Sequence, residues 1–265
     1  MATRNVNQQD TMATADDSNI DEEEEADESA MTLVEHLEEL RWRILKALLA
    51  IVVGSIIAFI FRDRILAFLT LPLPKTADAI NHGGRLVVTG IGEGFTVFLK
   101  LSIAVGFIFA LPVILYQAWA FISPGLYERE KKNAVPFIII GMVLFIAGIA
   151  LGFVVLQYPV QWLINFSAES FIPLVTADSY FTFVAFFLLA FGIVFEIPLV
   201  LTFLAQLGLI TSQSLKRRRP AAYIGMWIAA TFLTPGADPY SPIILGVAMT
   251  FLFELTILFI RITRH

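Results

Sequence analysis

The chain contains a series of long apolar stretches, and these constrain its fold more than any other feature. A helix needs about 20 apolar residues to cross the ~30 Å of hydrocarbon in a bilayer. The stretches lie at residues 44–61, 95–121, 136–156, 180–207, 221–233 and 241–260. The chain is 57% hydrophobic and 15% charged, whereas soluble domains are about 45–50% apolar and about 25% charged. Since lipid requires backbone hydrogen bonds to be made internally, we predict an all-α polytopic membrane protein with six transmembrane helices.

The fifth stretch is shorter than its neighbours. Only 14 residues lie between Arg219 and Thr234, and as a helix they rise roughly 21 Å. A helix of that length does not reach across the hydrocarbon, so we expect the bilayer to thin or water to enter beside it. We therefore predict shortened fifth and sixth helices that form a shallow hairpin. The alternative is an ordinary tilted helix that continues through Pro220, Ala221 and Ala222.

Lysine and arginine are distributed unequally between the two sides of these helices. The side of the N-terminal tail has Arg41, Arg43, Lys46, Arg129, Lys131, Lys132, Lys216, Arg217, Arg218, Arg219, Arg261 and Arg264. The opposite side has Arg62, Arg64, Lys75, Arg85 and, at its edge, Lys100. Because cytoplasmic loops carry the excess of basic residues, both termini are predicted to be cytoplasmic.

The first 30 residues are rich in acids and almost free of apolar side chains. Such a segment buries too little surface to offset the entropy of ordering it. We predict a disordered acidic tail over residues 1–30 and a six-helix membrane domain over residues 31–265. The tail has neither the basic start nor the apolar stretch of a secretory leader, which agrees with a cytoplasmic position.

Two acids, Glu196 and Glu254, lie inside apolar stretches. A charge at the bilayer centre costs about 2.5–3.5 kcal/mol on insertion scales, so an intramembrane acid is a candidate functional residue. Pro198 lacks a backbone donor and frees the carbonyl four residues earlier, which creates polar sites near Glu196. For Glu254 we favour a structural interpretation, in which its carboxyl group bonds to a neighbouring helix.

Other acids lie on the predicted cytoplasmic side. Glu39 and Arg43 are four residues apart, and such a pair on a helix usually forms a salt bridge worth about 0.3–0.5 kcal/mol. Glu130 lies in a polar segment, residues 123–132, after the second stretch. Taken alone, the first place is interpreted as a helix salt bridge and the second as a solvated loop.

Several motifs together make the chain resemble the TatC family, the multispan receptor subunits of the twin-arginine protein translocase. The motifs are HLEELRWR at residues 36–43, PVILYQAWAFISPGLY at 112–127 with Glu130, FEIP at 195–198, KRRRP at 216–220, and LTP at 233–235 with Asp238. The resemblance covers residues 31–262. One such motif is weak, but this many in order along one chain is a specific signal.

The resemblance implies that the cytoplasmic face binds signal peptides carrying two arginines. The matching residues are Glu130 as the main acid and Glu39 as the second, with Arg41, Phe121, Pro124 and Tyr127 also at recognition positions. Two carboxylates suit two guanidinium groups, because each charge-assisted pair is planar and bidentate. The resemblance further implies that the cargo is a folded protein and that the proton gradient drives its export.

The resemblance also implies single-span partners similar to TatA and TatB, and self-association within a hetero-oligomer. Glu196 matches the intramembrane acid linked to these partners, and Thr231, Thr234 and Asp238 lie at the outer hairpin. Many relatives have Gln where this chain has Pro242, so Thr231, Thr234 or Ser241 would have to replace that contact. The expected location is the bacterial plasma membrane, with the thylakoid membrane as the alternative.

Other function classes have less support. A proton-coupled small-solute transporter could use Glu196 and Glu254 as a relay, but we find no internal repeat of the kind that transporters often contain. The three histidines are scattered, and neither HExxH nor GxSxG occurs. The chain has no cysteine and no Gly-rich phosphate loop. We therefore expect no enzyme, cofactor, metal site or nucleic-acid partner.

Overall fold

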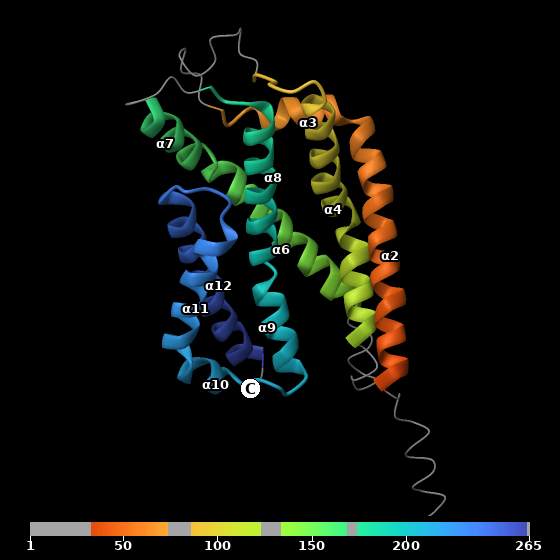
Figure 1. The fold of residues 1–265 in the computed structure, drawn as a ribbon. Helices are drawn as coiled ribbons and strands as arrows, with labels where there is room; N and C mark the ends of the chain where they lie inside the picture. Colours follow the sequence, from red (N-terminus) through yellow and green to blue (C-terminus); the bar gives the residue numbers. More distant parts are fainter. Residues whose placement is uncertain (1–32, 74–85, 123–133, 169–173, 264–265) are drawn as a thin grey trace, which may run out of the picture. The chain divides into compact units, whose positions relative to one another are not determined.

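The computed structural model describes residues 33–73, 86–122, 134–168 and 174–263 (Figure 1). These residues form α2 (Leu33–Ile60), α3 (Arg62–Leu69), α4 (Glu93–Ile122), α6 (Ala134–Val155), α7 (Gln157–Ala168), α8 (Ala177–Val194), α9 (Ile197–Gln206), α10 (Ser212–Arg217), α11 (Arg219–Leu233) and α12 (Tyr240–Thr263). The chain divides into two units at Leu45 and Lys46. The acidic tail predicted over residues 1–30 lies outside the described residues. The all-α prediction is confirmed.

Among the residues that the structure describes, five helical segments are long and apolar enough to cross a membrane. They are Glu35–Ile60, Glu93–Ile122, Ala134–Ser167, Ala177–Gln206 and Tyr240–Ile262. The remaining predicted span corresponds to α11, whose 15 residues rise about 22 Å. The prediction of a short sixth helix is wrong, because α12 has 24 residues and rises about 36 Å. Its apolar sequence continues to Ile262, and Pro242 near its N-terminus is tolerated where backbone donors have no intrahelical acceptor.

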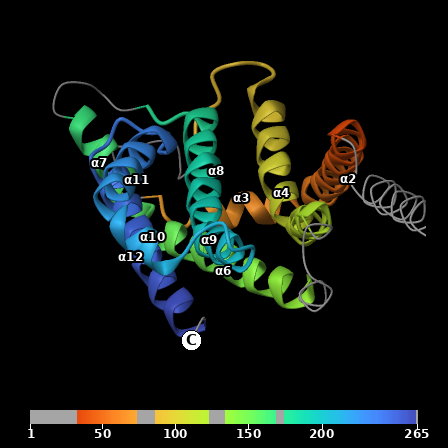
Figure 2. The same cartoon turned by 90° about the horizontal axis from the view of Figure 1, so that it is seen from below.

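Helix α8 forms the centre of the second unit and contacts both α4 and α6. Figure 2 shows α8 between α4 and the pair α11 and α12. Phe187 and Phe191 of α8 and Phe145 of α6 are fully buried. Helices α6 and α8 approach closely because glycine has no side chain at their contacts. A Cβ added at Gly192 of α8 would lie 2.7 Å from the ring of Phe145. Small residues at such contacts are typical of helix pairs in membranes.

The fourth predicted span is broken into α8 and α9. Helix α8 ends at Val194, and α9 begins at Ile197 with Pro198 in its first turn. Pro198 cannot donate a hydrogen bond to the carbonyl of Val194, as the sequence predicted. Glu196 therefore lies at the junction of the two helices. Helix α9 ends near Gly208, which has a φ of 77° and is the residue type suited to that conformation.

Short contacts join the first two turns of α4 to the first turn of α8. Lys100 Nζ lies 2.7 Å from Asp178 Oδ1, and Glu93 accepts hydrogen bonds from the backbone N–H groups of Gly90 and Asp178. The hydroxyl of Tyr180 donates to the carbonyl of Leu69 over 2.9 Å. These bonds connect segments far apart in the sequence, so they fix the end of the helix bundle that contains α3.

Three short helices, α3, α7 and α10, were not predicted. Helix α7 lies between the spans predicted at 136–156 and 180–207, where the sequence analysis assigned no helix. Its sequence, QYPVQWLINFSA, mixes polar and apolar residues and has Pro159 in its first turn. Val160 of α7 is buried against the core of the second unit. Packing of a partly apolar face thus stabilises a helix that lacks a long apolar run.

Many large apolar side chains on the long helices are exposed. On α12 these include Phe251, Leu255, Leu258 and Phe259. A water-soluble monomer rarely exposes contiguous apolar patches larger than a few hundred Å². The exposed faces therefore suit contact with lipid.

Candidate functional site

Glu39 is held by two residues of its own helix, α2. Arg43 donates to Glu39 Oε1 through Nε over 3.1 Å and also through Nη2. His36 Nδ1 lies 3.8 Å from Glu39 Oε2. The salt bridge predicted between Glu39 and Arg43 is therefore present. Oε2 is buried and accepts no hydrogen bond from any residue that the structure describes. One carboxylate oxygen thus keeps its capacity to accept.

The other predicted signal-binding residues are only partly covered by the structure. Arg41 is exposed on α2, and Phe121 is half-buried in the last turn of α4. Pro124, Tyr127 and Glu130 lie outside the described residues.

An aromatic cluster fixes both ends of the segment that contains Glu130. Trp119, near the end of α4, lies 4.8 Å from Phe137 of α6 and 5.5 Å from Phe203 of α9, measured between ring centroids. Phe137 and Phe203 are 5.8 Å apart. Aromatic pairs in such tilted or edge-to-face arrangements contribute about 0.5–1.5 kcal/mol beyond the apolar area they bury. The cluster holds Ile122 and Ala134 in place, where the described parts of α4 and α6 end. Sequence reasoning singled out none of these three aromatic residues.

Glu196 is half-buried at the junction of α8 and α9. Both of its carboxylate oxygens are shielded from solvent, and neither has a hydrogen-bond partner in the described part of the chain. Its side chain faces α6: a Cβ added at Gly141 would lie 3.3 Å from Glu196 Oε2 and 2.7 Å from Leu115 Cδ1. An unpaired polar group in apolar surroundings is costly, so this carboxyl group has an unmet capacity for hydrogen bonding.

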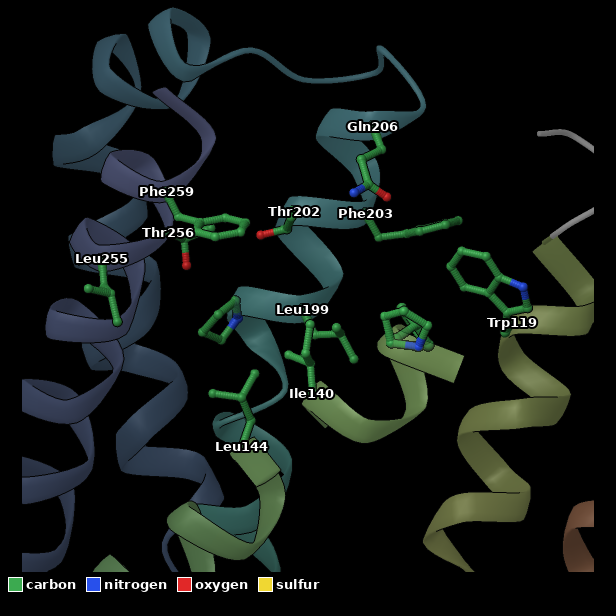
Figure 3. Close-up of a pocket in the computed structure, with 13 residues that line it drawn as sticks. Trp119, Ile140, Leu144, Leu199, Thr202, Phe203, Gln206, Leu255, Thr256 and Phe259 are labelled. Carbon is green, nitrogen blue, oxygen red and sulfur yellow. The ribbon is translucent and has the colours of Figure 1, made fainter. Parts of the chain in front are cut away.

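A cavity of about 330 Å³ lies between α4, α6, α9 and α12. Some of the residues that line it follow Glu196 closely in the sequence. Its walls are mostly apolar, and Pro198 and Leu199 form part of them (Figure 3). Figure 3 shows Thr202 of α9 pointing toward Thr256 and Phe259 of α12. Thr202 and Gln206 are the polar residues that α9 contributes. Thr202 and Gln206 are four residues apart, so they lie on the same face of the helix. This spacing within an apolar stretch could have been recognised in the sequence as a polar strip on α9.

The outer hairpin joins α11 to α12. Asp238 is buried and accepts two hydrogen bonds from Ser241, one from the backbone N–H over 2.7 Å and one from the hydroxyl over 2.6 Å. Asp238 thus caps the start of α12. Thr234 is also buried and donates to the carbonyl of Ala230. Thr231 is exposed, although its hydroxyl donates to the carbonyl of Trp227.

Glu254 differs from Glu196, because both of its oxygens are bonded. Arg219 Nη2 donates to Glu254 Oε2 over 2.5 Å, and the hydroxyl of Tyr223 donates to Oε1 over 2.5 Å. Both donors belong to α11, so the carboxylate joins α11 to α12. This agrees with the structural interpretation of Glu254.

Within residues 33–73, 86–122, 134–168 and 174–263, no three acids or histidines come together in a way that could hold a metal ion.

Comparison with known proteins identifies close similarity to one family. The family model of TatC, the Sec-independent protein translocase protein, matches residues 35–247. The chain is 36% identical to the Sec-independent protein translocase protein TatC of Desulforapulum autotrophicum over 89% of this chain and 86% of the relative. It is 33% identical to the TatC protein of Escherichia coli K12 over 88% of this chain and 90% of the relative. A crystal structure of the twin arginine translocase receptor TatC in DDM superposes with a TM-score of 0.74 and 32% identity, covering 85% of this chain and 99% of that one.

Proposed function

The chain belongs to the TatC family of Sec-independent protein translocase proteins, and on this premise we propose that it binds twin-arginine signal peptides through Glu39 and Glu130. The resemblance drawn from its motifs is confirmed. The protein is a receptor subunit of the twin-arginine translocase, a non-enzymatic transport component, and a multi-pass protein of the bacterial cytoplasmic membrane.

The state of Glu39 is the observation that carries this proposal. One oxygen of its carboxylate is bonded to Arg43, and the other is buried with no hydrogen-bond donor among the described residues. A guanidinium group of a signal peptide would supply such a donor, and a charge-assisted bond of this kind is worth about 1.5–3 kcal/mol. Glu130 would bind the second guanidinium group.

The proposal also assigns a role in signal-peptide binding to four residues near the two acids. Arg41, Phe121, Pro124 and Tyr127 lie beside the two acids in the sequence, at the ends of the first and second helices. The aromatic cluster of Trp119, Phe137 and Phe203 supports the end of α4 that leads into the segment with Glu130. A binding segment anchored at both ends loses less conformational entropy when a ligand binds.

The proposed arrangement has six spans with both termini in the cytoplasm. Two features support it: the excess of lysine and arginine in the loops on one side, and the antiparallel pair formed by α11 and α12. Glu39 and the segment with Glu130 then lie on the cytoplasmic face. Signal peptides reach them before transport, and the proton gradient drives the export of the folded cargo.

We further propose that Glu196 binds single-span partners similar to TatA and TatB. Its two unpartnered oxygens in an apolar environment suit a polar side chain on a partner helix. At the outer hairpin, exposed Thr231 contacts the partner, while buried Thr234 and Asp238 maintain the shape of the hairpin. Partner binding and self-association then produce a hetero-oligomer in the bilayer.

The test compares binding of a twin-arginine signal peptide with binding of its Lys-Lys version to the purified chain. We expect Glu39→Gln and Glu130→Gln each to weaken twin-arginine binding by about 10-fold or more, because each removes a charged acceptor. Glu38→Gln, the neighbouring exposed acid, is the matched control and leaves binding within about twofold. Equal binding of the two peptides, or unchanged crosslinking of the twin-arginine peptide to the Glu39→Gln, Glu130→Gln double variant, would refute the proposal.

A further inference from the structure

A pocket of about 590 Å³ lies where α10, α11 and α12 meet. Figure 1 shows α10 at the end of α11, close to the C-terminal end of α12. The pocket is lined by three basic residues, Lys216, Arg219 and Arg261, and by a single acid, Glu254. Neither Glu39 nor Glu196 lines it, and the function proposed above does not use it.

The acid in this pocket is already bonded within the protein. Arg219 and Tyr223 occupy the two oxygens of Glu254. Arg219 Nε is buried and has no acceptor in the described part of the chain. Lys216 and Arg261 form no ion pair with any described acid. Three cations against one carboxylate leave a net charge of +2, so the pocket lacks an anion with several acceptor oxygens.

The apolar part of the pocket lining belongs to α12. Phe251, Leu255 and Leu258 line the pocket, and all three are exposed. Their exposed faces continue along a helix that is long enough to span the membrane. The ligand therefore needs an anionic group at one end and a hydrocarbon chain at the other. A soluble anion would leave this apolar wall in contact with water.

We propose that this pocket binds the headgroup of an anionic phospholipid from the cytoplasmic leaflet. The phosphate oxygens accept hydrogen bonds from Arg219 and Lys216, Arg261 adds a further positive charge, and the acyl chains lie against Phe251, Leu255 and Leu258. Basic pockets between helices on the cytoplasmic side are suited to such headgroups. The cytoplasmic position rests on the orientation proposed above, but binding of the lipid does not require signal-peptide recognition.

The test uses the full-length chain purified in a neutral detergent. Phosphatidylglycerol and phosphatidylcholine with identical acyl chains are titrated separately, and bound lipid is counted by native mass spectrometry. We expect phosphatidylglycerol to bind at least 10-fold more tightly than phosphatidylcholine. Each basic residue near an anionic headgroup contributes about fivefold in affinity, so Lys216→Gln combined with Arg261→Gln should weaken binding about 25-fold. Arg219 is kept, because its bond to Glu254 joins α11 to α12.

Arg217→Gln combined with Arg218→Gln is the matched control. These neighbouring arginines are exposed and line a different surface pocket, so the pair removes the same charge without touching this site. We expect the control to change binding less than threefold. Equal losses in the two double variants would show a diffuse charge effect and overturn the proposal. So would equal binding of the two lipids, or displacement of the lipid by millimolar inorganic phosphate.

Discussion

Three carboxylates of the chain differ in how many hydrogen bonds they accept. Both oxygens of Glu254 are bonded, Glu39 has one bonded oxygen, and Glu196 has none within the described residues. The sequence ranked Glu196 above Glu254 as a functional candidate, because the cost of a charge in lipid depends on its depth. It predicted that Glu254 bonds to a neighbouring helix, but it did not identify the donors, because Arg219 lies 35 residues away on another helix.

Replacing Glu by Gln should affect the stability of the fold differently at Glu254 and at Glu196. Glu254→Gln removes the charged partner of Arg219, and we expect it to destabilise the fold by about 1–2 kcal/mol. Glu196→Gln breaks no hydrogen bond that the structure describes, and we expect an unchanged or slightly raised stability. Thermal unfolding of both variants in one detergent measures the difference. A large loss of stability in Glu196→Gln would contradict the unpartnered state of this carboxyl group.

A second measurement on Glu196 examines its proposed role. Glu196→Ala should reduce co-purification of a single-span partner about 5-fold or more, because a hydrogen bond between membrane helices contributes about 1–2 kcal/mol in model peptides. Twin-arginine peptide binding should stay within about twofold. Loss of peptide binding while the partner remains attached would reverse the assignment.

Helix positions followed closely from the apolar stretches. The predicted spans at 95–121 and 136–156 agree within two residues with α4 and α6. Hydrophobic length dominates in lipid, which explains this agreement. Helices α3, α7 and α10 were missed because packing, rather than a long apolar run, stabilises them. The aromatic cluster of Trp119, Phe137 and Phe203 was also missed, since its members come from three helices.

Contacts between helices α6 and α8 lead to a prediction about glycine. A Cβ added at Gly148 would lie 2.6 Å from the carbonyl oxygen of Phe191, which is backbone and cannot rotate away. We expect Gly148→Ala to destabilise the protein by about 1–3 kcal/mol. Gly225→Ala in α11 is the control, because nothing lies within 4 Å of its added Cβ. Replacing a helical glycine without a clash stabilises by up to about 1 kcal/mol. Parallel shifts of both unfolding temperatures would contradict the close approach of the two helices.

For the whole molecule, the distribution of charge and the length of the helices predict one orientation in the membrane. The chain has no cysteine, so single introduced cysteines report their position without background. Gln213 lies on α10, before α11, and Ala237 follows α11 in the connection to α12; both are exposed. The first is predicted to face the cytoplasm and the second the outside.

A membrane-impermeant maleimide should therefore label Ala237→Cys in intact cells. Gln213→Cys should be labelled only after the membrane is permeabilised. The reverse pattern, or labelling of both positions from one side, would exclude the proposed six-span arrangement. Glu39 and Glu130 could then no longer be placed together on the cytoplasmic face by this argument.

The short helix α11 has a consequence for assembly. At about 22 Å, its 15 residues fall short of a bilayer core of about 30 Å, and in the six-span arrangement a ring of compressed lipid surrounds it. Each ångström of mismatch costs a fraction of a kcal/mol. Two short helices side by side share one ring, so less lipid is deformed in total. The elasticity of the membrane thus favours neighbours whose own apolar segments are short, and it selects them by length before any polar group is recognised.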